Sequence, residues 1–282
     1  MLANGGGVTD YMEVVGKGRK ITKPAVPWIA VPTTAGTGAE VTRNAVIGWP
    51  EKKFKASIRS ELLMARVALI DPELHVDVPP HVTASSGADA LCQCIEAYVS
   101  RGANPMTDAV AIKGVDLWDI DRVFPDGGDV EARVDMAMAA LCGGIALTNA
   151  GLGAVHGFAA PLGANFPIPH GTVCGLLLPH VIQANIEALK ARADGRATLR
   201  KYADIGRAMG GDRNNDEISL RACVVSVDEI LHDLNLPSLS HFGMTEADIP
   251  PMVDLAKRAS STRYNPVELS DDALAEILRR SL

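Results

Sequence analysis

The stretch that decides the fold is residues 136–186, which read MAMAALCGGIALTNAGLGAVHGFAAPLGANFPIPHGTVCGLLLPHVIQANI and contain no Asp, Glu, Lys or Arg. A long run without charge first suggests a membrane span. Here glycine and proline interrupt it too often for a long apolar helix, at Gly143, Gly144, Gly151, Gly153, Gly157, Pro161, Gly163, Pro167 and Pro169. We therefore predict buried helices and a connecting loop at the centre of a soluble domain, and no membrane span.

Three of the seven histidines, His156, His170 and His180, lie inside this stretch. An imidazole in an uncharged interior needs a hydrogen-bond partner, a ligand or a neutral state. We predict that the segment between His156 and His170 is a helix end followed by a loop, which returns the second imidazole beside the first. For each histidine alone, a hydrogen-bonded core residue is the more common outcome.

A carboxylate in another apolar segment adds to this pair. Asp89 and Gln93 are four residues apart in a segment of helical spacing, so both lie on one face and can share one ion. One carboxylate and two imidazoles suit a divalent transition metal with open coordination positions. The sequence therefore predicts a candidate metal site at Asp89, Gln93, His156 and His170, and two core histidines remain the alternative.

The first part of the chain has a strand-like pattern. The apolar run 28–32 ends at Pro32, and a second run at 66–70 is followed by Asp71-Pro72. Between them, residues 33–40 read TTAGTGAE, a loop of small residues whose hydroxyls and backbone amides can cradle a phosphate. A plain glycine-rich turn is the competing interpretation.

Helical apolar spacing takes over after Pro79-Pro80. We predict caps at Thr245 and Ser270 and a boundary near residue 76, with an incomplete α/β domain at 1–75 and an all-α domain at 76–282. The expected helices are Ala84 to Val99, Pro105 to Trp118, Glu131 to Leu147, Val173 to Arg192, Ala197 to Met209, Ser219 to Leu234, Glu246 to Ala259 and Asp271 to Leu282.

Composition excludes several classes of protein. Lys+Arg 27 against Asp+Glu 34 gives a net charge of −7, which argues against a nucleic-acid binder. A hydrophobic content of 47% excludes a disordered chain. Five cysteines are an odd number with no secretory signal before them, so we expect buried free thiols and a cytoplasmic protein rather than a disulfide framework.

Several of these motifs together resemble the iron-containing (group III) alcohol dehydrogenase family, from about Tyr11 to the carboxyl terminus. Residues 32–40 resemble the family's nucleotide loop, Asp71-Pro72 its interdomain turn, and residues 87–91 its first metal helix. Residues 151–180 resemble the signature around the last two metal histidines. The resemblance implies a predominantly helical, dehydroquinate synthase-like architecture and an oxidoreductase that uses NAD or NADP on a small alcohol or aldehyde, as a homodimer or larger assembly in its full-length form.

The resemblance also implies roles for particular residues. His156 and His170 would be catalytic and, with Asp89, would hold Fe²⁺ or Zn²⁺; Lys55 would lie near the cofactor ribose. The cofactor phosphates would contact Thr33, Thr34, Gly36 and Thr37.

Three departures from the family pattern leave alternatives open. The remaining metal histidine is replaced by Gln93, a weaker ligand, and the histidine four residues after His156 is Ala160. The family's Gly-Gly-Gly-Ser motif and preceding strands have no counterpart, so we expect an amino-terminally truncated chain that binds NAD(P) weakly or not at all. The alternatives are a metal-independent enzyme similar to maleylacetate reductase and a non-catalytic helical interaction module.

Overall fold

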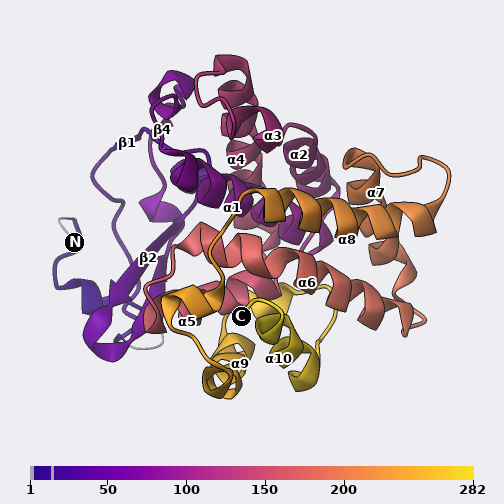
Figure 1. The fold of residues 1–282 in the computed structure, drawn as a ribbon. Coiled ribbons are helices and arrows are strands. Elements are labelled where there is room, and N and C mark those ends of the chain that lie inside the picture. Colours follow the sequence, from indigo (N-terminus) through magenta and orange to yellow (C-terminus); the bar gives the residue numbers. More distant parts are fainter. Residues whose placement is uncertain (1–2, 14–15) are drawn as a thin grey trace.

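A computed structural model describes residues 3–13 and 16–282. The strands come first in the chain and the long helices follow (Figure 1). Two short strands, β1 (Ile29–Ala30) and β4 (Val67–Ala68), pair in parallel, with Ile29 opposite Val67. The longer strands β2 (Asn44–Trp49) and β3 (Phe54–Arg59) form an antiparallel hairpin, with Asn44 opposite Arg59.

The two strand-like runs of the sequence are confirmed as β1 and β4, although only two residues of each form ladder pairs. The hairpin β2–β3 has no counterpart in the sequence analysis. Its strands are joined through a turn in which Lys53 has a φ of 47°, the left-handed region that a non-glycine residue seldom adopts. The hairpin packs against the uncharged stretch, because β3 contacts α5.

Helices make up the rest of the chain, and no strand follows β4 in the described residues. An α/β portion followed by an all-α domain is thus confirmed. The α-helices are α1 (Pro80–Val99), α2 (Pro105–Asp116), α3 (Ile120–Val123), α4 (Val130–Ala150), α5 (Ala154–Asn165), α6 (His170–Lys190), α7 (Arg196–Ala208), α8 (Asp216–Asp233), α9 (Ile249–Arg258) and α10 (Asp271–Arg279). Short 3₁₀ helices lie at Val8–Asp10, Ala39–Val41, Pro50–Lys52, Glu61–Leu63, Pro72–His75, Leu239–Phe242, Glu246–Asp248 and Thr262–Tyr264.

The expected helices all form, with ends shifted by a few residues, and both predicted caps are present. The Ser270 side chain accepts a hydrogen bond from the Ala273 amide at the start of α10. Thr245 forms a capping box with Asp248 at the Glu246–Asp248 turn, which precedes α9. The segment expected as one helix from Glu246 therefore divides into a 3₁₀ turn and an α-helix.

The segment between the two histidines is the remainder of a helix followed by a loop, as expected, but this helix, α5, was not among the expected helices. His156 lies in its first turn. Proline favours a break, but Pro161 lies inside α5, because packing of this helix against α6, α9 and β3 outweighs the local preference. The loop after α5 does return the chain, and His170 is the first residue of α6.

The core is formed where α1 packs against α4 and α6 (Figure 1). In α1, every residue from Gly87 to Val99 is buried. By length and composition α6 could cross a membrane, and α4 with α5 passes the same test as a pair bent by 101°. However, 67% of the apolar window of α6 is buried inside the protein, the pattern of a core helix. All five cysteines are buried and free, as expected.

The backbones of α6 and α1, and of the 33–40 loop and α4, approach each other closely at two glycines. A Cβ added at Gly171, in the first turn of α6, would lie 1.8 Å from the Ser85 carbonyl oxygen of α1. A Cβ added at Gly144 of α4 would lie 2.4 Å from the carbonyl oxygen of Gly38, whose own φ is +56°. Glycine thus lets α6 approach α1, and lets the 33–40 loop approach α4.

Candidate functional site

A cluster of polar side chains lies where α1, α5 and α6 meet. Asp89 comes from α1, His156 from α5 and His170 from α6. The Asp89 Oδ1 atom is 3.3 Å from His156 Nε2 and 3.7 Å from His170 Nε2, and the two imidazole centres are 5.3 Å apart. Asp89 and His156 are buried, whereas the His170 side chain is 42% exposed. The cluster is therefore open to solvent on the His170 side.

Asp89 is an ionised carboxylate in this cluster. Burial alone would raise its pKa, but His170 and His156 outweigh burial and hold the pKa at about 2. The Oδ1 atom has no hydrogen-bond partner, despite the two nearby imidazole nitrogens. A buried anionic oxygen without a partner is costly. This oxygen is therefore free to accept a cation.

Glu96, which the sequence analysis missed, orients His156. Its carboxylate accepts hydrogen bonds from the Val155 amide at 2.7 Å and from His156 Nδ1, also at 2.7 Å. With Nδ1 engaged, the Nε2 of His156 is the nitrogen that faces Asp89. Glu96 lies seven residues after Asp89 on the same face of α1. That spacing of two carboxylates in an apolar helix was the available signal.

Asn265 completes the anchoring of α5. Its Oδ1 accepts a hydrogen bond from the Ala154 amide at 3.1 Å, and its Nδ2 donates to the Asn185 Oδ1 of α6 at 2.7 Å. The preceding Gly153 offers no side-chain cap. Two side chains from other elements, Glu96 and Asn265, therefore satisfy the first amides of α5 and fix the position of His156.

Gln93 lies beside Asp89, as the helical spacing predicts. Its Nε2 donates a hydrogen bond to Asp89 Oδ2 at 3.1 Å. Its Oε1 is buried without a partner and lies against Gly143, where an added Cβ would be 3.2 Å away. The amide nitrogen of Gln93, rather than its oxygen, faces the carboxylate, so this side chain positions Asp89.

The cluster fits a divalent transition metal. The ligand atoms of Asp89, His156, His170 and Cys174 all lie within 4.8 Å of one another. Burial is the main cause that lowers the pKa of His170, which favours the neutral imidazole that a metal needs. Imidazole, carboxylate and thiol are donors that zinc and iron accept.

The predicted cofactor loop lies against the same end of α1. Gly36 is buried against Ser86 of α1, because an added Cβ at Gly36 would be 3.0 Å from the Ser86 Cβ. Ser86 lies about one helical turn before Asp89. Thr33, Thr34 and Thr37 are exposed. The loop therefore presents hydroxyl groups to solvent close to the cluster.

Lys55, on β3, lies close to α5. Its Nζ is 2.6 Å from the position of an added Cβ at Gly163 of α5. Burial lowers the pKa of His170 most, and the charges of His156 and Lys55 lower it further. Burial also lowers the pKa of Lys55 itself. Ala160, one turn after His156 in α5, brings no titratable group.

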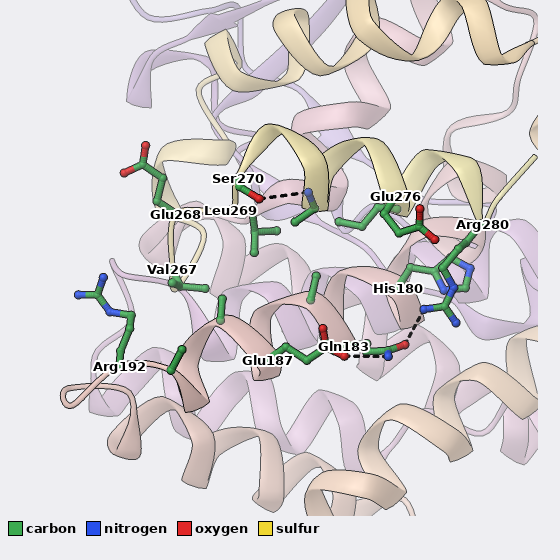
Figure 2. Close-up of a pocket in the computed structure, with 15 residues that line it drawn as sticks. His180, Gln183, Glu187, Arg192, Val267, Glu268, Leu269, Ser270, Glu276 and Arg280 are labelled. Carbon is green, nitrogen blue, oxygen red and sulfur yellow. Dashed lines mark hydrogen bonds between the residues drawn. The ribbon is translucent and has the colours of Figure 1, made fainter.

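A groove between α6 and α10 is separate from this cluster and contains none of its residues (Figure 2). Three of its polar side chains satisfy one another, because Arg280 donates to Gln183 Oε1 at 2.6 Å and Gln183 donates to Glu187 Oε1 at 2.9 Å. The His–Asp cluster, with its unpartnered carboxylate oxygen, remains the candidate site.

Comparisons with known proteins agree with this geometry. Residues 1–72 match the model of iron-containing alcohol dehydrogenase, and residues 83–282 match the carboxyl-terminal model of the Fe-containing alcohol dehydrogenase family. Alcohol dehydrogenase 4 of Saccharomyces cerevisiae is 36% identical over 284 residues, which is 100% of this chain and 70% of that protein.

Solved structures show the same relationship. An alcohol dehydrogenase from Oenococcus oeni superposes with a TM-score of 0.88 at 31% identity, over 100% of this chain and 71% of that one. A sulfoacetaldehyde reductase from Bifidobacterium kashiwanohense, solved with NAD⁺, gives a TM-score of 0.83 at 30% identity, over 99% of this chain and 71% of that one. The chain therefore belongs to the iron-containing alcohol dehydrogenase family, a family of oxidoreductases.

Proposed function

We propose that this chain transfers a hydride between NAD or NADP and a small alcohol or aldehyde, with the help of a divalent cation. The observation that carries the proposal is the buried, ionised Asp89, whose unpartnered Oδ1 faces the Nε2 atoms of His156 and His170. Membership of a dehydrogenase family, and the NAD⁺ in the structure of the Bifidobacterium relative, support the choice of cofactor.

Asp89, His156 and His170 would hold Fe²⁺ or Zn²⁺. When bound, such a cation acts as a Lewis acid toward an alcohol or aldehyde oxygen. The protein's own contribution is orientation: Glu96 fixes the tautomer of His156, and Gln93 holds the second oxygen of Asp89. The half-exposed His170 marks the side from which a small substrate would enter.

The cofactor phosphates would lie on the 33–40 loop. Thr33, Thr34 and Thr37 offer exposed hydroxyls, and Gly36 leaves room for a close backbone approach. Lys55, beside α5, brings positive charge near His170. We propose that it contacts the cofactor ribose.

A second candidate function is metal-independent reduction, as in maleylacetate reductase. Gln93 favours it, because an amide stands where the family has an imidazole, and so does Ala160, which brings no titratable group. A non-catalytic helical module is the third possibility. The first function needs both a metal and NAD(P), the second needs NAD(P) without a metal, and the third needs neither.

The test is reduction of small aldehydes by the purified chain with NADH or NADPH, with and without added Fe²⁺ or Zn²⁺ under anaerobic conditions. Because we expect this chain to bind NAD(P) weakly, we expect metal-dependent activity only at high cofactor concentration. His156→Ala should abolish that activity, and the matched control His241→Ala, at an exposed histidine, should retain it. Activity that survives metal removal would favour the metal-independent enzyme. Absence of both turnover and cofactor binding would favour the non-catalytic module.

A further inference from the structure

We propose that Cys174 is the fourth protein ligand of the metal site, in place of the imidazole that Gln93 does not supply, and that the site therefore selects zinc over ferrous iron. The inference rests on the metal site of the proposed function. It assigns this chain the protein ligands Asp89, His156, His170 and Cys174. The substrate oxygen would be a fifth ligand, since a catalytic zinc can expand to five-coordinate.

The position of Cys174 carries the first step. It lies four residues after His170 on the same face of α6 and is fully buried. Its Sγ is 3.9 Å from Nε2 of His156, the nitrogen that Glu96 leaves free. The sulfur therefore points at the same space as the Oδ1 of Asp89.

The distances between these atoms fit one tetrahedral ion. Zinc bonds of about 2.0–2.3 Å place neighbouring ligand atoms of a tetrahedron roughly 3.3–3.8 Å apart. The Nε2 of His156 is 3.3 Å from Asp89 Oδ1 and 3.9 Å from Cys174 Sγ, and the Oδ1–His170 distance is 3.7 Å. The remaining pairs of ligand atoms lie within 4.8 Å, so shifts of up to about an ångström would close the set around a cation.

Gln93 is a poorer fourth ligand than Cys174. Its Nε2 already donates to Asp89 Oδ2, and its Oε1 lies against Gly143 of α4. Rotating the amide to present the oxygen would lose the hydrogen bond that positions Asp89. An amide oxygen is also a weak donor for zinc or ferrous iron, whereas a thiolate is a strong one.

Cys92 is a second buried thiol near His156, but its geometry excludes it as the metal ligand. Its Sγ lies 3.8 Å from Nδ1 of His156, the nitrogen that donates to Glu96 at 2.7 Å. A cation beside Cys92 would have to displace that hydrogen bond. Cys92 is also fully buried, so it is a matched control for Cys174.

Coordination by Cys174 changes the charge and the softness of the site. On binding, the thiol loses its proton to solvent and the thiolate forms the bond to the cation. The carboxylate and the thiolate then balance the two positive charges. Because a soft sulfur ligand with nitrogen and oxygen in a tetrahedron suits zinc, the site should prefer zinc to ferrous iron.

The test uses Co²⁺ as a spectroscopic probe, added to the whole chain under reducing, anaerobic conditions. A thiolate ligand to Co²⁺ produces a sulfur-to-metal charge-transfer band in the near ultraviolet. We expect the band in the wild type and in Cys92→Ser, and its loss in Cys174→Ser and Cys174→Ala. We also expect a metal dissociation constant raised about tenfold or more in both Cys174 variants, and a lower ratio of bound zinc to iron in competition dialysis.

The outcomes separate this inference from the proposed function. If wild type binds Co²⁺ without the band, or if Cys174→Ala keeps the band, Cys174 is not a ligand and the metal site itself still stands. If the wild type binds no Co²⁺, Zn²⁺ or Fe²⁺, the metal-assisted function fails and the inference fails with it. Circular dichroism of each variant checks that the helices remain folded.

Discussion

The helical part of the chain and its α/β portion differ in how they are held together. One continuous core of buried residues runs through the helices from α1 to α10. In the residues that the structure describes, the α/β portion has its own buried cluster of four residues, Tyr11, Met12, Ala56 and Ile58, and leaves large apolar side chains such as Ile29 and Val46 exposed. The His–Asp cluster is therefore set in the helical core, and the 33–40 loop reaches the same core through Ala35.

The largest expected effect comes from removing a side chain from the helical core. Phe158 of α5 is fully buried, so Phe158→Ala should lower the free energy of unfolding by about 3–5 kcal/mol. In the α/β portion, Val46 is 64% exposed, and Val46→Ala should cost less than about 1 kcal/mol. Urea unfolding followed by circular dichroism measures both. Equal losses in the two variants would remove the contrast between the regions.

The next effect concerns the close approach of α6 to α1. Gly171→Ala would place a Cβ 1.8 Å from the Ser85 carbonyl oxygen, so α6 must move away from α1. We expect a loss of about 1–3 kcal/mol of stability, and weaker metal binding because His170 moves with the helix. Gly48→Ala is the matched control, since an added Cβ there meets no atom within 4 Å. A fully stable Gly171→Ala variant with unchanged metal affinity would contradict this account.

The difference between the regions also explains what the sequence could predict. The helices after Pro79-Pro80 have a clear apolar period, and all of them form. The hairpin β2–β3 was missed although β3 alternates apolar and polar residues. The apolar residues of β2 do not alternate, and the positive-φ position of the turn holds Lys53 rather than the glycine or asparagine usual there. The helix α5 was missed because Pro161 and the glycines suggest a loop, and only tertiary packing keeps the segment helical.

Prediction of the site had a similar limit. Asp89 and Gln93 follow from spacing within one helix, and the uncharged stretch indicated that His156 and His170 face inward. Glu96 lies on that same helix face, but its role depends on where α5 begins. The crossing of α1, α5 and α6 decides which atoms of Gln93 and Cys174 face the cluster. A single sequence carries no direct signal for that crossing geometry.

A smaller effect is expected from the residue that orients His156. Glu96→Gln keeps the size of the side chain but replaces an anion that accepts from Val155 and His156. We expect the metal dissociation constant to rise about 10–100-fold, as for other outer-shell partners of metal histidines. Metal titration of the purified variant measures this. The control Glu131→Gln changes a side chain that is 91% exposed and should bind metal like the wild type. Unchanged affinity in Glu96→Gln would remove its positioning role.

The smallest effect distinguishes two buried carboxyl groups, one in each region. Histidines lower the pKa of Asp89, whereas burial raises the pKa of Glu40, at the end of the cofactor loop. A raised folded-state pKa means that folding favours the protonated form of Glu40. Ionisation of Glu40 therefore costs stability as the pH rises above its unfolded pKa of about 4.3, and the cost is complete above the folded pKa.

Glu40→Gln removes that cost without changing the shape of the side chain. We expect the variant to be more stable than the wild type at pH 7, and this advantage to shrink as the pH is lowered toward about 4, where Glu40 is mostly protonated in both states. Urea unfolding at the two pH values measures the difference, and the exposed Glu51→Gln is the control. An advantage that is the same at both pH values would show that the carboxylate charge is not its cause. A variant less stable than the wild type at pH 7 would mean that Glu40 has a partner in the folded loop, and that the α/β portion stabilises its buried charge as well as the helical part does.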